Sequence, residues 1–229
     1  MDVALAGSSS PHARGPYLKL PHMHGENEIG EGSFLSGTRI ALASGDDAAE
    51  MSVDELKSGD HVATLGSVSP TRPVLSGTQR RVDHSMHALP VLVTPIRFAA
   101  DSFGSGMPQR ALLLPPEALV LIRDLASPAL VPAGALLNGT SIARAPPATP
   151  LNWFALELDA HDVVLAENLP VATVRGPNTD APDHLQARCA RLLLPGAELE
   201  ALRVRLAGPS EGRGGQAMAE IAGDDRRSG

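Results

Sequence analysis

The chain has 229 residues, a net charge of −7, one cysteine and few aromatic residues (four Phe, one Tyr and one Trp), which allows one substantial domain with tails. This composition excludes an internal disulfide and a zinc site built on several thiolates, and its short basic runs are not those of a nucleic-acid-binding domain. No segment is long enough for a membrane helix and residues 1–15 lack a signal-peptide pattern, so we expect a soluble protein with no membrane partner, cytoplasmic or exported without an N-terminal signal.

The first part of the chain is rich in Gly, Ser, Pro and His and shows no hydrophobic periodicity. We therefore expect residues 1–32 to form a flexible leader. His22 and His24 have metal-ligand spacing, but no rigid element is expected to hold them, so we interpret them as incidental histidines and predict no metal site.

The next segment predicts two short strands around a turn and a helical turn. Residues 38–43 and 61–65 have strand patterns, with apolar residues alternating in the second. Between them, residues 51–56 are expected to form one helical turn, with Ser52 as the N-cap and Glu55 placed for a capping box.

The middle of the chain predicts more strands separated by proline-rich breaks. Residues 66–73 read as a Pro/Ser loop, and residues 90–98 as a strand. The apolar runs 112–114 and 118–122 are separated by Pro115 and Pro116, which favours two strands joined by a corner.

The last third predicts a hairpin, two strands and one helix. The run 129–137 ends at Asn138-Gly139, which favours a type I′ hairpin with a return strand. Residues 153–158 and 162–166 read as strands, and residues 175–184 as a loop. Over 197–207, leucines at helical spacing among good helix formers predict a short helix. With 20 Pro and 22 Gly, the fold class is mostly β.

Four segments, in this order, resemble motifs of one family. Residues 33–40 read Ser-Phe-Leu-Ser-Gly-Thr-Arg-Ile, and residues 53–62 read Val-Asp-Glu-Leu-Lys-Ser-Gly-Asp-His-Val. Residues 136–142 read Leu-Leu-Asn-Gly-Thr-Ser-Ile, and residues 157–170 read Glu-Leu-Asp-Ala-His-Asp-Val-Val-Leu-Ala-Glu-Asn-Leu-Pro. Together they resemble a bacterial branch of the Hint (hedgehog/intein-type) self-processing domains.

The resemblance implies a domain organisation and a chemistry. It implies a single horseshoe-type β domain over residues 33–174, after the leader and before a polar tail, 175–229, that carries the short helix. In active members the first residue of the domain attacks the preceding carbonyl and converts an amide into an ester or thioester. The chain is then its own substrate and partner, and no cofactor is required.

Ser33 stands at the position of the family's nucleophile. By this resemblance its attack on the Gly32 carbonyl would give an ester, with Gly32–Ser33 as the scissile bond. A serine hydroxyl needs a nearby base or strain to react, because it is far less acidic than a thiol. The alternative is that Ser33 is only a polar residue at a strand start.

The helper position of the family departs from its usual pattern. Where members carry a hydroxyl residue and then a histidine, this chain reads Pro-Pro-Glu-Ala over residues 115–118, so that Ala118 occupies the histidine position. If this stretch is extended, Glu117 should point to the opposite face. The general-acid assistance that the histidine supplies, worth roughly 10²- to 10⁴-fold in rate, is absent from Ala118.

His161 is the histidine that the resemblance retains. It could act as a proton shuttle oriented by Asp159 or Asp162, which gives a candidate catalytic set of Ser33, His161, Asp159 and Asp162. The alternative is a histidine that stabilises a β-turn by hydrogen bonding.

Three functions remain open from the sequence. The first is slow self-cleavage at Gly32–Ser33 through an ester, and the second is a catalytically inactive Hint-like scaffold acting as a binding or secretion-associated module. The third, a hydrolase of other molecules, lacks a Gly-x-Ser-x-Gly motif to support it. Splicing is not expected, because no asparagine preceded by histidine closes the domain.

Overall fold

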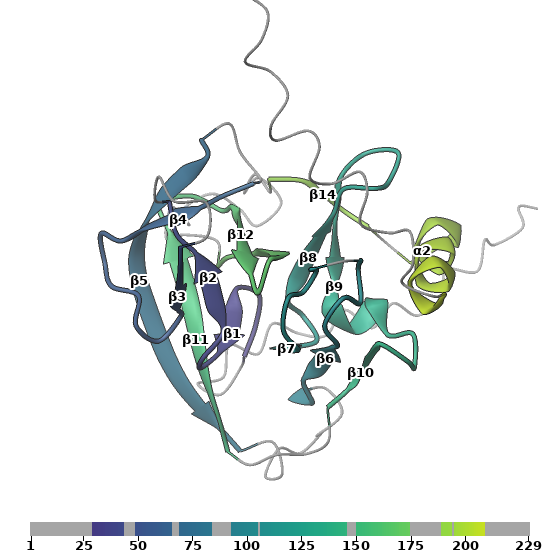
Figure 1. Cartoon of the computed structure of the whole chain (residues 1–229), viewed down its shortest axis with the longest axis horizontal. Helices are drawn as coiled ribbons and strands as arrows, with labels where there is room; N and C mark the ends of the chain where they lie inside the picture. The colour runs from purple at the N-terminus through teal and green to yellow at the C-terminus, as the bar shows by residue number, and fades with distance from the viewer. Residues whose placement is uncertain are drawn as a thin grey trace, which may run out of the picture.

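The computed structural model describes residues 29–43, 49–65, 69–83, 93–104, 106–145, 150–174, 189–193 and 195–208. These residues form three β-sheets with one α-helix near the C-terminus, so the predicted mostly-β class is confirmed (Figure 1). Within the described part of the chain, no helix is long and apolar enough to cross a membrane.

A four-stranded sheet forms one margin of the molecule and carries the start of the domain. Its order is β1 (Ser33–Leu35), β11 (Leu151–Leu158), β5 (Thr71–Val82) and β4 (His61–Ala63). β11 pairs along its whole length with residues 74–82 of β5, and the two strands form a long curved ribbon (Figure 1). β1 pairs with the other edge of β11, so β11 lies between β1 and β5.

The two other sheets lie beside it and close around a common core. A three-stranded sheet has the order β10 (Ile142–Arg144), β6 (Ile96–Phe98) and β7 (Leu112–Leu114). The seven-stranded sheet has the order β14 (Arg191–Leu192), β9 (Ala129–Pro132), β8 (Leu119–Ile122), β13 (Leu169–Ala172), β12 (Val163–Ala166), β2 (Arg39–Ala41) and β3 (Glu50–Ser52).

The main core is built mostly from aliphatic side chains, with a few aromatic ones, contributed by all three sheets. Its largest fully buried members include Phe34, Phe98, Ile40, Leu112 and Leu158. Because the chain has so few aromatic residues, Leu, Ile, Val and Ala provide most of the packing, as the composition predicts.

The predicted C-terminal helix is confirmed as α2 (Ala197–Ala207) and is part of this core. Leu199, Leu202 and Leu206 are buried in the main cluster, each contributing about 1.5–3 kcal/mol by its removal from water. The helix packs against the 3₁₀ helix η2 (Ala133–Leu136), at the side of the molecule opposite the β5–β11 ribbon (Figure 1). The last strand, β14, adds to the edge of the seven-stranded sheet, so this region is more than a polar tail.

Two local predictions are wrong. Residues 51–56 do not form a helical turn with an N-cap: Met51 and Ser52 belong to β3, and the Ser52 hydroxyl donates to Asp54 Oδ1 at 2.5 Å instead. Asn138-Gly139 is not a type I′ hairpin, because only Gly139 has a positive φ and β9 is followed by η2. The Asn138 side-chain oxygen accepts from the backbone N–H groups of Thr140 and Ile142, which produces a different turn.

Two stretches predicted as irregular or extended also differ. Thr71–Pro73, predicted as part of a loop, begins β5 and pairs with β4. The alternation of β5 is weak because most of its side chains face solvent and only Val74 and Val82 are buried. Residues 115–118 form a turn closed by a hydrogen bond from Ala118 N to Pro115 O at 3.0 Å, so this stretch is not extended. Residues 84–92, which include the start of the strand predicted over 90–98, lie outside the described residues, as does the loop predicted over 175–184.

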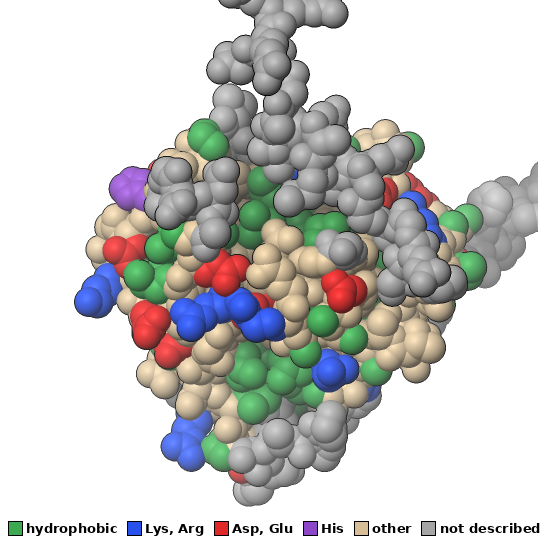
Figure 2. Space-filling view, viewed as in Figure 1, with side chains coloured by type: hydrophobic (Ala, Val, Ile, Leu, Met, Phe, Trp, Pro, Cys, Tyr) green, Lys and Arg blue, Asp and Glu red, His purple; other side chains and the backbone are tan. Residues whose placement is uncertain are grey.

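The charged side chains on the face in Figure 2 are mixed in sign. Lys and Arg are scattered over it, and Asp and Glu border the central basic group. Charged side chains of opposite sign also form pairs: Arg110 donates a hydrogen bond to Glu50 and forms an ion pair with the buried Glu167.

Candidate functional site

A tight turn leads into the domain at the predicted scissile bond. Residues 30–33 are closed by a hydrogen bond from Ser33 N to Gly30 O at 3.3 Å, and Gly32 has φ +75°. A positive φ at the third residue is what a type II turn requires, and glycine adopts it without steric cost. Residues 29–32, which the sequence assigned to the leader, therefore contact the folded unit, whereas residues 1–28 lie outside the described residues.

Gly32 packs directly against the end of the domain. A Cβ atom on Gly32 would lie 2.1 Å from Val174 N and 2.5 Å from the carbonyl carbon of Thr173. The chain therefore enters the domain against the segment by which it leaves, although these residues are far apart in sequence. The absence of a side chain at residue 32 is what allows this close approach.

The carbonyl oxygen of Gly32 has a fixed donor. Leu156 N–H, on β11, donates to Gly32 O at 3.0 Å, while Val174 N–H donates to Leu156 O at 3.1 Å. The Gly32 carbonyl, which belongs to the predicted scissile bond, is thus held in one orientation by a backbone amide. A backbone donor at this distance also stabilises negative charge that develops on the oxygen.

Ser33, the predicted nucleophile, begins β1 and lies opposite Ala155 of β11. It is 6% exposed, so the serine is largely shielded from solvent. It directly follows the entry turn, at the position where the sequence predicts the nucleophile.

The helper position does not provide a substitute acid. Ala118 is fully buried and belongs to the main hydrophobic cluster, directly after the turn that follows β7. Its methyl group packs in the core, and its amide N–H donates a hydrogen bond to Pro115 O. A histidine introduced at this position would have to displace neighbouring core side chains.

His161 is held by two groups that the sequence did not single out. Its Nε2 lies 3.0 Å from Glu31 Oε1, and its Nδ1 accepts a hydrogen bond from Cys189 N–H at 3.3 Å. Because Nδ1 is an acceptor, the tautomer that fits both contacts carries its proton on Nε2 and donates it to Glu31. In this arrangement the hydrogen-bond partners of both ring nitrogens are Glu31 and Cys189, and neither nitrogen is paired with Ser33.

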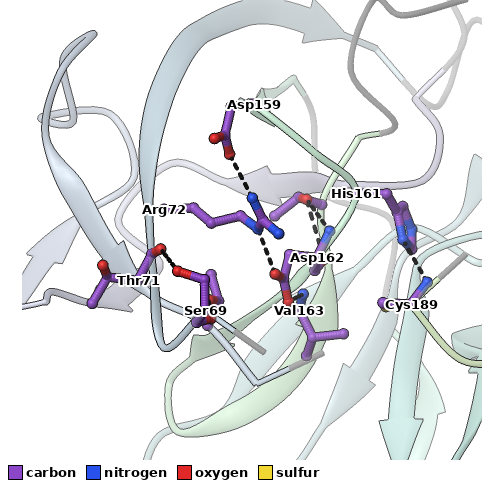
Figure 3. A network of polar contacts seen from close by, with 10 residues as sticks. Ser69, Thr71, Arg72, Asp159, His161, Asp162, Val163 and Cys189 are labelled. Carbon is purple, nitrogen blue, oxygen red and sulfur yellow. Dashed lines mark hydrogen bonds and ion pairs between the residues drawn. The ribbon is translucent and has the colours of Figure 1, made fainter. Parts of the chain in front are cut away.

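Asp159 and Asp162 do not orient His161. Figure 3 shows both carboxylates directed at Arg72 while the His161 ring points to Cys189. Arg72 Nε donates to the fully buried Asp162 at 2.6 Å, and its Nη1 donates to Asp159 at 3.0 Å. These hydrogen bonds, the one to Asp162 first, raise the pKa of the Arg72 guanidinium. The two aspartates therefore fasten β5 to the β11–β12 connection and have a structural role here.

This arrangement of an entry turn beside the exit segment coincides with a family match. A family model described as "Hint domain" matches residues 32–176, which is more than half of the chain. The chain belongs to the Hint domain family. The match begins at Gly32 and ends two residues after Val174. Gly32 and Val174 are in contact in the structure.

Solved structures with a similar fold are distant in sequence. A bacterial intein-like domain from Clostridium thermocellum has 13% identity and a TM-score of 0.46, covering 64% of this chain and 100% of that domain. A splice-inactive, GSH-linked variant of the AceL NrdHF class 3 split intein has 10% identity and a TM-score of 0.42, covering 63% and 99%. No curated protein sequence matches the chain significantly.

Sequence reasoning missed Glu31, Arg72, Cys189 and the Leu156 amide in this Hint domain. Glu31 and Arg72 were placed in segments predicted as leader and loop, so their charges had no assigned partner. A backbone amide has no sequence signal at all. The one available hint was the charge of Arg72, a half-buried residue of β5 that pairs with two acidic residues of the closing motif.

The described residues of the Hint domain contain no group of three or more His, Cys, Asp or Glu side chains that could hold a metal ion. His22 and His24 lie outside the described residues.

Proposed function

We propose that this Hint domain is a self-processing module, and that its reaction is the transfer of the Gly32 acyl group from the Ser33 nitrogen to Ser33 Oγ. The observation that supports this most is the fixed Gly32 carbonyl, held by Leu156 N–H at 3.0 Å immediately before a shielded serine. The substrate is the chain itself.

The reaction requires one bond to form and one to break. Ser33 Oγ attacks the carbonyl carbon of Gly32, and the negative charge that develops on Gly32 O is stabilised by the Leu156 amide. The C–N bond then breaks, and the hydroxyl proton is transferred to the Ser33 nitrogen. The product is an ester with a free amine on Ser33, and attack by water releases the leader with a carboxylate on Gly32.

The same geometry indicates that the reaction is slow. The nitrogen of Ser33 must be protonated as it leaves, and Ala118 provides no acid at the family's helper position. This loss lowers the rate by roughly 10²- to 10⁴-fold. His161 has both ring nitrogens engaged with Glu31 and Cys189, and would have to change partners before it could transfer a proton.

Intact mass spectrometry of the freshly purified full chain, with and without hydroxylamine, tests the proposal. Hydroxylamine should cleave the ester and give two fragments that separate between Gly32 and Ser33, the first as a hydroxamate. The Ser33→Ala variant should stay whole. A single 23.8 kDa species under every condition would contradict self-processing.

A cysteine variant distinguishes two causes of slow cleavage, a weak nucleophile and an unsuitable geometry of the site. Ser33→Cys introduces a thiol, with a pKa of about 8.5, and should cleave faster than the native serine if the carbonyl is correctly held. Ser36→Cys is the matched control, because Ser36 is exposed and lies just beyond β1. Cleavage of the first variant but not the second would assign the reaction to this turn.

A second candidate function is a catalytically inactive Hint scaffold used for binding. It is supported by the buried Ala118 and by the two occupied nitrogens of His161. It predicts that the Ser33→Ala and Ser33→Cys variants both stay whole and keep the melting temperature of the parent chain.

A further inference from the structure

A small apolar cluster lies outside the main core, on the four-stranded sheet. Ile29 is 7% exposed, Val82 7% and Trp153 1%, and Leu35 and Leu151 pack against them. Four of these residues come from β1, β11 and β5, while Ile29 comes from the segment before the domain. Ile29 is three residues upstream of the family match, which begins at residue 32.

Strand register explains why these side chains meet. Leu35 lies opposite Trp153, and Leu151 lies opposite Val82. Leu151 and Trp153 are two residues apart on β11, so their side chains point to the same face of the sheet. The four side chains therefore form one apolar surface, and Ile29 is buried against it.

The segment upstream of the Gly32–Ser33 bond is thus held at three successive points. Ile29 is buried against the cluster, Glu31 binds His161, and Gly32 O accepts from Leu156 N–H. The Ile29 contact is the apolar one and lies farthest from the bond. It uses a side chain that the reaction itself does not need.

We propose that Leu35, Val82, Leu151 and Trp153 form a subsite for a large aliphatic side chain four residues before Ser33, and that Ile29 is the positioning residue that fills it. This inference rests on the proposed function, because it treats the segment before Ser33 as the substrate. Ile29 acts through the entry turn: while it is docked, the Gly32 carbonyl stays on the Leu156 amide. Polar residues at position 29 are not accepted.

The single tryptophan of the chain reports on this subsite directly, because it is Trp153. Ile29→Asp should shift the Trp153 emission to longer wavelength as water reaches the indole. Ile29→Leu should leave it unchanged, because leucine has a similar volume and polarity. Leu75→Asp is the matched control: Leu75 is also on β5 but is 41% exposed and outside the cluster.

Amide hydrogen exchange separates positioning from simple filling of space. In Ile29→Asp, exchange should accelerate at Ser33 N–H and Leu156 N–H, the donors of the entry turn, while the amides between β8 and β13 keep their protection. Unchanged exchange at these two amides would overturn the inference, as would an equal loss of protection throughout the domain.

Cleavage adds a second readout that keeps the two proposals apart. Where the parent chain or its Ser33→Cys variant is cleaved with hydroxylamine, Ile29→Asp should reduce the rate on the order of 10²-fold, the effect expected from misplacing a reacting group by about 1 Å. An unaltered rate would refute the positioning role. If no parent chain is cleaved, self-processing fails, and hydrogen exchange still decides whether Ile29 positions the turn.

Discussion

Replacement of Gly32 by alanine tests the structural basis of the site most directly. Gly32 has φ +75°, a conformation that costs about 1–2 kcal/mol for a residue with a Cβ atom. The added methyl group would also lie 2.1 Å from Val174 N and 2.5 Å from the carbonyl carbon of Thr173. Because these two atoms belong to the backbone, no side-chain rotation can relieve the clash. Val174 is in turn held by its hydrogen bond to Leu156 O.

The expected result is a loss of at least 1–2 kcal/mol, or roughly 2–8 °C in melting temperature for a chain of this size. Thermal unfolding followed by circular dichroism measures it. Gly30→Ala is the matched control: no atom lies within 4 Å of its Cβ position and no positive φ is required there. Its stability should be unchanged or raised by about 0.4–1 kcal/mol. Equal melting temperatures for the two variants would refute the close approach of entry and exit segments.

Three further predictions concern the scaffold around the site. Arg72→Met should destabilise the fold by about 3 kcal/mol in guanidinium unfolding, because it leaves the fully buried Asp162 carboxylate without its cation. Leu202→Ala should cost about 2–5 kcal/mol in the same assay, because it opens a cavity under α2. The hydrogen bond from Ser52, and then the one from Gly37 N–H, lowers the pKa of Asp54. The ionised Asp54 therefore stabilises the fold fully above its unfolded-state pKa, and this contribution is lost as the pH falls through its folded-state pKa. In a carboxyl NMR titration, the Ser52→Ala variant should show a higher pKa for Asp54 than the parent chain.

The first two of these predictions have controls on the same chain. Arg191→Met removes an ion pair that is exposed on both sides, so it should cost only about 0–1 kcal/mol. Val204→Ala changes the outer face of α2, where the side chain is 75% exposed, and should be nearly neutral. If Arg191→Met cost as much stability as Arg72→Met, the argument from the buried Asp162 would be wrong. If Leu202→Ala were neutral, the cavity argument would be wrong. If the pKa of Asp54 were the same in Ser52→Ala, the argument from the Ser52 hydrogen bond would be wrong.

Strands with a buried face were predictable, and strands without one were not. The segments around β7, β8, β11 and β12 were identified because their apolar side chains face the core and so leave a pattern in the sequence. β5 was missed because its outer residues face solvent and its stability comes from backbone pairing with β11. The type I′ hairpin predicted at Asn138-Gly139 was wrong because the Asn138 side chain accepts hydrogen bonds from the backbone N–H groups of Thr140 and Ile142, which gives a different turn.

By itself, the sequence determined the mostly-β class, the C-terminal helix and the Hint family, because periodicity and ordered motifs are local properties of the chain. It also led to the prediction that Gly32–Ser33 is the scissile bond. Tertiary structure alone decided which groups surround that bond: Val174 against Gly32, Leu156 N–H on its carbonyl, and Glu31 on His161, 130 residues away in sequence. Hydrogen bonds and close contacts depend on which distant segments the topology brings together, and no local pattern of residues encodes that pairing.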